Sequence, residues 1–538
     1  MPEHYGIWSV VPPLIAIALA MLTRRVAISL FCGIAAAALI LGGGQPWVSL
    51  KIMWAHSLWP TISDQDHLRV LAFTVFLGAM IGVIHQAGGM EGMVAKIRPW
   101  ASTRRRGQLT GWLLGLLIFF DDYANTLLLG STMRPVVDRL KISREKLAYI
   151  VDSTAAPVAG IALLSTWVGF EISQIQDGLD GLHIATASDA AFRIFVTTII
   201  YRFYPVLALL MVGMIAVTGR DFGPMLAAER RALSGADPAQ DVLSSLHVTS
   251  ANQRLGRWYV AVIPIVAVII VLLATLFWTG RTKESSDAGS LWVILSAGDA
   301  FLSLVVASLF GLIVAIALAR YSGQLSVGKV WEGFMRGAQL MMPALLILWL
   351  AWSLTSLLES PNASDANHLR TADYLSGMIS GTISVHWLPT VVFLLASIVA
   401  YCTGTSWATM TILTPLVIGV TWKALLANGE TPTTDHHLLL ASVGSVLAGS
   451  IFGDHCSPIS DTTILSSRAS QCDHVAHVWT QMPYALTVAA ISVICGTIPV
   501  GFGLSAWVAM PLAIVALFTA ILVFGSVVQE GRGDTVEQ

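Results

Sequence analysis

The sequence predicts an all-α polytopic membrane protein with about eleven transmembrane helices, two opposed re-entrant hairpins and discontinuous helices at the midplane, arranged as two inverted repeats. Three observations predict this fold class: the composition, the recurrence of long apolar runs, and polar segments that interrupt apolar stretches in both halves. Of the 538 residues, 55% are hydrophobic and 12% are charged, whereas soluble domains carry roughly 25% charged residues. The lipid bilayer is therefore the expected surrounding of most of the chain.

Apolar runs long enough to cross a hydrocarbon core about 30 Å thick recur along the chain. The expected crossings are residues 7–22, 26–41, 70–87, 147–170, 194–218, 258–279, 298–319, 338–358, 438–465, 482–500 and 504–527. Arg24 and Arg25 follow the first run where a signal peptide would have a small-residue cleavage site. We therefore interpret that run as a retained helix.

Two further apolar segments, residues 109–133 and 387–413, are broken in their middles by polar or small residues. The first has basic clusters at both of its ends, at residues 96–106 and 134–146. Because Lys and Arg concentrate in cytoplasmic loops, both of these ends belong on the same side of the membrane. A hairpin fits this charge pattern and a simple crossing does not. The pattern also predicts an outside N-terminus and a cytoplasmic C-terminus.

An internal repeat relates the two halves of the chain. The matched pairs are Asn125 with Thr405, Thr126 with Ser406, Pro135 with Pro415 and Pro157 with Pro458. We expect a first repeat over residues 1–219 (hairpin 109–133, broken helix 147–170) and a cytoplasmic linker over 220–257. A second repeat then covers 258–503 (hairpin 387–413, broken helix 438–467), and an extra helix and tail cover 504–538. Because the basic residues place the two hairpins on opposite sides, the repeats are inverted, as is typical of secondary transporters.

The polar residues at the breaks are the candidate site. Pro157 and Pro458 free backbone carbonyls that a cation can use, and the hairpin tips add hydroxyl and amide oxygens. A carboxylate at membrane depth costs several kcal/mol unless it is paired, hydrated or neutralised, so it is a functional candidate. The candidates for binding an ion or substrate are Asp122, Asn125, Thr126, Asp152, Ser153, Thr154, Thr405, Ser406, Asp454, Ser457, Asp461 and Thr462. Na⁺ is the metal ion expected at this oxygen-rich site.

Three further residues are candidates for proton relay or charge pairing. Asp121 adjoins Asp122, so one of the two acids is expected to point away from a common site. His455 titrates near neutral pH when unperturbed, and a purely structural histidine is an equal alternative. Arg202 has three interpretations: it binds a carboxylate substrate, neutralises an aspartate, or extends to the membrane interface. Some of the aspartates also have a plain structural interpretation as caps of half-helices.

Three segments of the chain closely resemble the signature segments of the NhaC-type Na⁺/H⁺ antiporter family, within the ion transporter superfamily. They are residues 119–126, 149–157 and 453–463. The resemblance implies exchange of Na⁺ and H⁺ by an elevator motion, with Asn125, Thr126, Thr405 and Ser406 at hairpin tips. It implies no cofactor beyond these ions, and a bacterial inner membrane location. Many elevator transporters are dimers, so a homodimer is expected by analogy.

Other functions remain as alternatives. The same family includes exchangers of organic anions such as malate and lactate, so a Na⁺- or H⁺-coupled exchanger of a small organic anion or amino acid is the main one. An ion channel and an intramembrane aspartyl enzyme that uses Asp152 with Asp454 are more distant, because inverted repeats and hairpins have no purpose in an enzyme. Nucleotide and nucleic-acid motifs are absent from the sequence, so we expect a gradient-driven transporter and no nucleic-acid partner.

Overall fold

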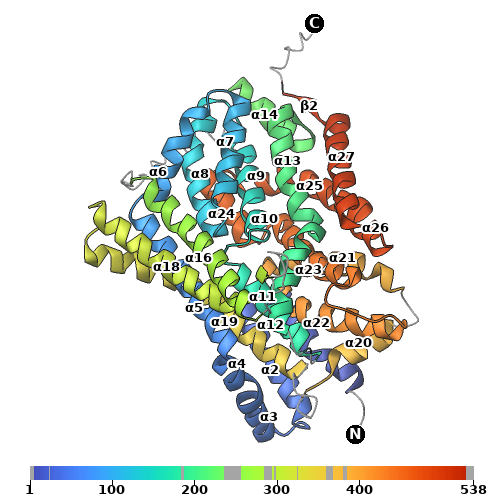
Figure 1. Ribbon diagram of the computed structural model, residues 1–538. Coiled ribbons are helices and arrows are strands. Elements are labelled where there is room, and N and C mark those ends of the chain that lie inside the picture. The colour runs from blue at the N-terminus through green and yellow to red at the C-terminus, as the bar shows by residue number, and fades with distance from the viewer. Residues whose placement is uncertain are drawn as a thin grey trace.

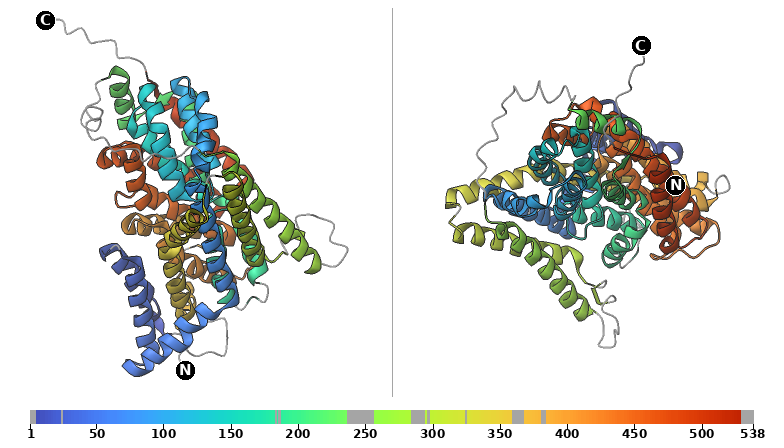
Figure 2. Two further views of the ribbon diagram at one scale, coloured as in Figure 1. Left: turned by 90° about the vertical axis from the view of Figure 1, so that its left-hand side faces the viewer. Right: turned by 90° about the horizontal axis from the view of Figure 1, so that it is seen from above.

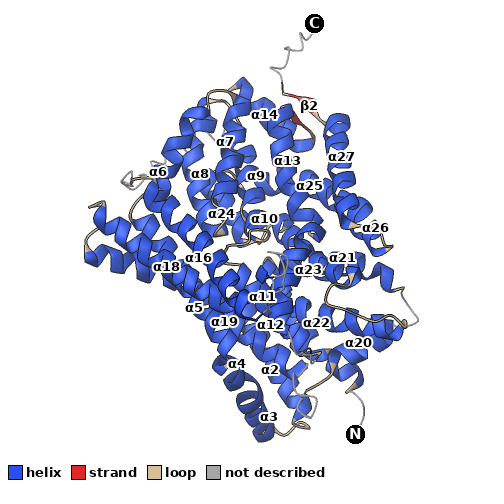
Figure 3. Ribbon diagram, viewed as in Figure 1, coloured by secondary structure: helices blue, strands red, loops and turns tan. Residues whose placement is uncertain are grey.

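The computed structural model describes residues 5–23, 25–182, 184, 187–235, 256–283, 294–295, 298–323, 325–358, 368–379 and 384–528. These residues are nearly all helical, and their only sheet is an antiparallel ladder of two short strands, β1 and β2 (Figures 1 and 3). Several residues named in the sequence predictions lie outside the described residues: Arg24, residues 236–255 of the linker, residues 359–367 after the crossing expected at 338–358, and residues 529–538 of the tail.

The chain begins with a series of helices that precede the first candidate hairpin. They are η1 (Gly6–Ser9), α1 (Val11–Thr23), α2 (Val26–Leu41), α3 (Pro46–Ile52), η2 (Met53–Leu58), α4 (Trp59–Ser63), α5 (Gln65–Gln86), α6 (Gly89–Ile97) and η3 (Arg98–Trp100). The axis bends by 118° between α2 and the helical segment 46–63. Gly43 and Gly44 both have positive φ at this turn, a backbone conformation that glycine adopts without strain.

The first candidate hairpin and broken helix follow. The elements are α7 (Arg104–Leu117), α8 (Asp122–Arg139), α9 (Arg144–Thr154), α10 (Ala156–Ala159), α11 (Val168–Asp180), α12 (Ala187–Thr198), η4 (Ile199–Tyr201), α13 (Phe203–Thr218), β1 (Arg220–Asp221) and α14 (Gly223–Ser234). The chain turns between α7 and α8 at residues 118–121.

The second half contains the longest helices. Its elements are α16 (Tyr259–Lys283), α18 (Ala300–Tyr321), α19 (Val327–Leu358), α20 (Thr371–Ile379), η5 (Val385–Trp387), α21 (Leu388–Thr403), α22 (Ser406–Ala427), α23 (His437–Cys456), α24 (Asp461–Ser470), α25 (His474–Ile491), η6 (Ser492–Thr497), α26 (Ile498–Gly501), α27 (Ala506–Phe524) and β2 (Ser526–Val527). The α16 and α18 pair extends from one side of the molecule (Figure 2).

Within the described residues, nine helices are long and apolar enough to span a membrane, or up to eleven if each of two bent pairs is one span. The protein is therefore a multi-pass membrane protein of the all-α class, as predicted. The inverted relation of the two halves and the domain limits stay predictions.

Two segments differ from the expected crossings. Residues 171–180 lie in the interval between the crossings expected at 147–170 and 194–218, and they form most of the buried helix α11. The crossing expected at 482–500 begins earlier, at His474, so a polar stretch before Met482 lies inside the helix. In addition, the second hairpin is longer than residues 387–413, since α22 continues to Ala427 and each arm alone reaches spanning length.

The packing of the two halves brings the broken helices together. Helix α24 from the second half packs on α8 and α9 from the first half, and α25 also packs on α9 (Figure 1). In the second half, α21 packs closely on α23. Residues around positions 120–155 therefore lie beside residues around 400–480, and this interface holds the candidate site.

Candidate functional site

Two breaks in the helices shape the site. Helix α9 ends at Thr154, and Ala155 has non-helical φ and ψ of −83° and −91° before Pro157 starts the short α10. Helix α23 ends at Cys456, and the non-helical residues 457–460 lead to α24. The freed carbonyl of Pro458 accepts a hydrogen bond from His474 Nε2 over 2.7 Å. Both breaks thus occur at the prolines that cannot continue a helical hydrogen-bond ladder.

Asn125 holds the tip of the first hairpin against α9. Its amide nitrogen lies 2.8 Å from the Gly115 carbonyl, 3.2 Å from Ile118 O and 2.8 Å from Thr154 O. Its Oδ1 atom is buried and has no hydrogen-bond partner among the described residues. The side-chain nitrogen of Asn125 therefore donates to carbonyl oxygens that the turn leaves without helical partners. Its Oδ1 atom remains available to accept a hydrogen bond or to bind a cation.

The tip of the second hairpin is held in a similar way. Gly404 adopts φ +68°, and a Cβ atom there would lie 2.8 Å from the Ile459 carbonyl oxygen, so only glycine fits this close approach. Ser457 Oγ donates to Tyr401 O over 2.7 Å. Ser406 Oγ, in the first turn of α22, donates to Asp454 Oδ2 over 3.3 Å. The second hairpin is thereby joined to both sides of the second break.

Three aspartates lie near one another between the hairpins, and we call Asp122, Asp454 and Asp461 the aspartate group. Asp122 is near enough to Asp121 and Asp461 for charge interaction, and Asp454 is near enough to Asp461. Tyr123 OH donates to Asp461 Oδ2 over 2.7 Å. Asp454 is 2% exposed and its Oδ1 has no hydrogen-bond partner in the described chain. A buried, incompletely bonded carboxylate is suited to bind a cation or a proton.

Asp152 lies in a separate polar cage. Its Oδ2 accepts from Gln481 Nε2 over 2.9 Å and lies 3.3 Å from His477 Nε2, while Ser466 Oγ donates to Oδ1 over 3.3 Å. Asp152, His477 and Gln481 are almost fully buried. Unlike Asp454, Asp152 has several side-chain hydrogen-bond partners, which compensate for its removal from water.

His455 joins this cage to a tyrosine on α13. Its Nε2 lies 3.1 Å from Ser153 Oγ and 4.0 Å from Asp152 Oδ2, and its Nδ1 lies 2.6 Å from Tyr204 OH. The main-chain oxygen of His455 also accepts from Gln481. The predicted candidates Asp152, Ser153 and His455 are therefore in mutual contact.

Four residues of the site were not predicted from the sequence: His477, Gln481, Ser466 and Tyr204. A signal was present for the first two, because His477 and Gln481 are four residues apart and lie on one face of a helix. The crossing was expected to begin after them, so they were assigned to a loop. No local signal identifies Ser466 or Tyr204.

Several predicted site residues have structural roles. Asp121 caps α8, since its Oδ1 accepts from Ala124 N over 2.7 Å. Thr126 and Thr154 donate to carbonyls of their own helices. Thr462 Oγ1 lies 3.0 Å from Ser460 Oγ, and Thr405 is the N-cap residue of α22. These groups stabilise the tips and breaks that surround the aspartates.

Arg202 is paired with a glutamate and with none of the candidate aspartates. It is fully buried, and its guanidinium donates to Glu171 Oε2 over 2.6 Å and to the Gly160 carbonyl. Thr198 Oγ1 lies 3.2 Å away. The partner of Arg202 is therefore a glutamate on α11, between the crossings expected at 147–170 and 194–218.

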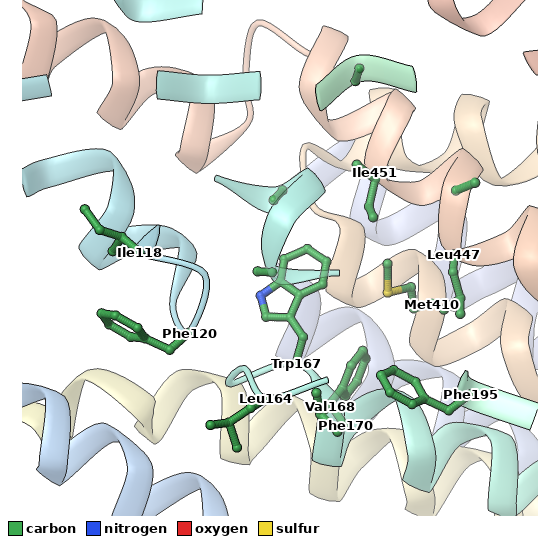
Figure 4. Packing of buried hydrophobic residues seen from close by; sticks show 14 of the residues in the cluster. Ile118, Phe120, Leu164, Trp167, Val168, Phe170, Phe195, Met410, Leu447 and Ile451 are labelled. Carbon is green, nitrogen blue, oxygen red and sulfur yellow. The ribbon is translucent and has the colours of Figure 1, made fainter. Parts of the chain in front are cut away.

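Aromatic side chains close the apolar side of the site. Trp167 lies between Ile118 and Phe120 of the first hairpin and Ile451 of α23 (Figure 4). The Thr166 amide donates to Phe120 O over 2.9 Å. Among the described residues, no three His, Cys, Asp or Glu side chains form a metal-ligand cluster. The oxygens near the breaks are a mixture of carboxylate, hydroxyl and carbonyl groups.

Three kinds of comparison give relatives of the chain. The sequence model of the Na⁺/H⁺ antiporter family matches residues 158–502. An uncharacterised protein of Haemophilus influenzae is 32% identical over 532 residues, which are 96% of this chain and 95% of the relative. The Malate-2H⁺/Na⁺-lactate antiporter of Bacillus subtilis is 36% identical over 116 residues, or 21% of this chain and 22% of that protein.

An uncharacterised Na⁺/H⁺ antiporter of Haemophilus influenzae is likewise 36% identical over 118 residues, 21% of this chain and 23% of that protein. Among solved structures, the YdaH transporter of Alcanivorax borkumensis has a similar fold. The TM-score is 0.57 at 15% identity, and the match covers 90% of this chain and 99% of that one. At this identity the structural likeness shows a shared fold alone.

Proposed function

Because the chain belongs to the Na⁺/H⁺ antiporter family, we propose that this multi-pass secondary transporter exchanges Na⁺ for H⁺ at the aspartate group. The observation that carries the proposal is the state of Asp454. Its carboxylate is buried between two broken elements, Ser406 bonds one of its oxygens, and the other has no partner among the described residues.

Competition for one carboxylate gives exchange a simple physical basis. When Asp454 is ionised, it attracts Na⁺, and Asp122 and Asp461 add to the attraction. When Asp454 is protonated, the attraction for the metal falls and Na⁺ leaves. An empty, ionised site resists movement through the membrane because the charge is not compensated. Occupation by either Na⁺ or H⁺ thus permits passage in alternate directions.

Asp152 is proposed to contribute charge and shape. Its hydrogen bonds to Gln481 and Ser466, with His477 beside it, fix its position. It interacts electrostatically with Asp454. The fixed negative charge of Asp152 beside the exchangeable charge of Asp454 favours cation binding. Asp152 keeps its own hydrogen-bond partners when the cation binds.

The manner of transport is also proposed. We expect alternating access by an elevator motion in a homodimer, in a bacterial inner membrane, with the N-terminus outside and the C-terminus cytoplasmic. Arg104, Lys141 and Arg220 lie at the same end of the molecule as α14 and β2. This concentration of basic residues supports a cytoplasmic position for that end.

An organic-anion exchanger is the second candidate, favoured by the local similarity to the malate and lactate antiporter. An anionic substrate needs a cationic partner at the site. Arg202 is the buried cation that the sequence suggested as a partner of a carboxylate substrate, but it is already paired with Glu171. The histidines around Asp152 would have to serve instead, so simple cation exchange is the better supported function.

The test is internal pH in proteoliposomes of the purified protein after NaCl, LiCl or KCl is added outside. Na⁺ is expected to drive proton movement in the wild type and in Asp473→Asn, an exposed helix cap that carries the same substitution. It is expected to drive none in Asp454→Asn. If the wild type is silent with all three salts but exchanges labelled malate or lactate, the second candidate replaces the first. Equal rates in Asp454→Asn and the wild type would exclude Asp454 as the exchange site.

A further inference from the structure

Helix α11 carries polar side chains at a regular spacing although most of it is buried. Glu171, Gln174 and Asp177 follow each other every third residue, so they lie along one side of the helix. Asp177 faces the start of α5, where its Oδ1 lies 3.3 Å from His67 Nε2. Glu171 lies deeper and is bonded to Arg202. The polar side of α11 therefore runs from the edge of the molecule toward its centre.

The contacts of α11 fix its register against α22. Phe170 packs on Trp407 with ring centroids 4.3 Å apart. Eight residues later on each helix, a Cβ on Gly178 would lie 3.0 Å from Pro415 Cα. The two helices therefore run parallel. Gln174 lies four residues from both Phe170 and Gly178. Thr411 likewise lies four residues from both Trp407 and Pro415. The two residues therefore face one another across the interface.

Both of these facing residues lack protein partners. Gln174 is 0% exposed, and neither its Oε1 nor its Nε2 has a hydrogen-bond partner among the described residues. The same holds for the hydroxyls of Thr411 and Thr414 and for Asp177 Oδ2. Buried polar atoms without protein partners are costly unless water or an ion bonds to them. In the membrane, such groups line paths for ions and water.

An indentation in the surface marks the outer end of this interface. A pocket between α11, α19 and α22 is lined by residues that include Asp177, Gly181, Leu358, Pro415 and Gly419. It also reaches Lys423, whose ammonium lies 2.9 Å from the Asp373 carboxylate and is neutralised by it. Asp177 belongs both to the lining of the pocket and to the polar side of α11, so the two meet at this residue.

The inner end of the interface approaches the breaks. Glu171 is bonded to Arg202, which donates to the carbonyl of Gly160 just after α10. The same irregular segment reaches the first hairpin through the hydrogen bond from Thr166 N to Phe120 O, next to Asp121. These hydrogen bonds link Glu171, at the inner end of the polar side of α11, to the segment beside the first hairpin.

We propose that the interface between α11 and α22 is a hydrated passage for monovalent cations, which leads from the pocket at Asp177 past Gln174 and Thr411 to the aspartate group. This inference depends on the proposed Na⁺/H⁺ exchange only for the identity of the cation and the direction in which it moves. By the predicted orientation, the Asp177 end faces the outside. Gln174 and Thr411 supply the neutral oxygens that replace part of the hydration shell of a cation.

Cysteine labelling tests the passage without relying on transport. Gln174→Cys and Thr411→Cys are introduced singly into the full-length protein with its five native cysteines replaced. Whole cells are then treated with a charged, membrane-impermeant methanethiosulfonate. Controls are Ile172→Cys and Thr409→Cys, which are equally buried and lie on the opposite faces of the same helices. Labelling of both test cysteines at least tenfold faster than the controls is expected, and equal rates would overturn the proposal.

Transport variants give a second, separate readout. Gln174→Leu and Thr411→Val remove the polar atoms with little change in volume. The matched control is Thr74→Val on α5, whose hydroxyl donates to its own helix. At least a tenfold fall in exchange rate is expected for the two test variants, with the Na⁺-dependent rise in melting temperature of the purified protein retained. Unchanged rates in both variants would contradict a passage at these residues.

The two proposals fail in different ways. If the wild type exchanges no cation for protons but Gln174→Cys and Thr411→Cys are labelled, the passage stands and Na⁺/H⁺ exchange falls. If the wild type exchanges Na⁺ for H⁺ but neither test cysteine is labelled faster than its control, the cation reaches the aspartate group by another route.

Discussion

The buried ion pair of Arg202 and Glu171 predicts how much stability the protein loses when one of the two residues is replaced. Both side chains are 0% exposed and their charged atoms are 2.6 Å apart. At an effective dielectric constant of about 20, Coulomb attraction at this distance is about 6 kcal/mol. Desolvation of the two ions offsets most of it, so the intact pair adds little net stability. Removal of one partner leaves the other charge buried and costs about 3 to 5 kcal/mol.

The perturbation is therefore a double-mutant cycle of Arg202→Met, Glu171→Gln and the double variant. Each single substitution is expected to lower the free energy of unfolding by about 3 to 5 kcal/mol. The double variant is expected to lose clearly less than either single variant, since it leaves no unpaired charge. An ordinary hydrogen bond between membrane helices contributes about 0.6 kcal/mol on average, so the two cases are well separated.

The assay is reversible unfolding of the purified protein in mixed micelles, followed by tryptophan fluorescence. A loss below about 1 kcal/mol in either single variant, or a double variant that loses the sum of both, would refute the reasoning. Transport by the double variant adds a further test. If Arg202 serves only to compensate Glu171, the double variant keeps exchange activity; complete inactivity with normal folding would indicate direct contact with the substrate.

Three other predictions concern the site and the cytoplasmic end. Gly115→Ala is expected to cost about 1 to 3 kcal/mol, seen as a lower melting temperature, because a Cβ there would overlap the side chain of Thr154. Tyr123→Phe removes the donor to Asp461, so the apparent affinity for Na⁺ measured by transport is expected to change by about 5- to 30-fold, which corresponds to roughly 1 to 2 kcal/mol. Burial raises the pKa of Glu229 above its ordinary value of 4.5, so its contribution to stability is present below pH 4.5 and is lost as the pH rises through the raised pKa. Glu229→Gln is therefore expected to flatten the fall in melting temperature with rising pH.

Matched controls accompany these variants. Gly328→Ala places a Cβ in open space, Tyr321→Phe changes an exposed ring, and Glu332→Gln changes an exposed carboxylate. Each control is expected to behave like the wild type in the same measurement. A control that matches its test variant would show that the substitution type, and not the local contact, causes the effect.

The breaks in the helices could be predicted because their cause is local. Pro157 and Pro458 have no amide hydrogen, so a break near them follows from the sequence alone. Helix α11 could not be predicted in this way. It is buried by protein and not by lipid, so it needs no continuous apolar run, and Ser173, Gln174 and Asp177 reduce its apolar character.

The partners of the site residues depend on contacts far apart in the chain. The aspartates could be identified because a carboxylate in an apolar stretch is exceptional. Gln481 could not be assigned to Asp152, since 329 residues separate them and no local pattern encodes the contact. Glu171 is only 31 residues from Arg202, but it lies outside the crossings expected from the sequence, so it was not considered as a partner.

The distance along the chain between Asp152 and Gln481 has a consequence for biosynthesis. At roughly 5 to 20 residues per second, the ribosome needs about 16 to 66 s after it adds Asp152 before it adds Gln481. During that time the helix that ends at Thr154 lacks the side chains that later bond its carboxylate. The nascent chain must therefore keep Asp152 hydrated, protonated or shielded by the insertion machinery until α25 arrives. Completion of the site is thus one of the last events in the synthesis of the protein.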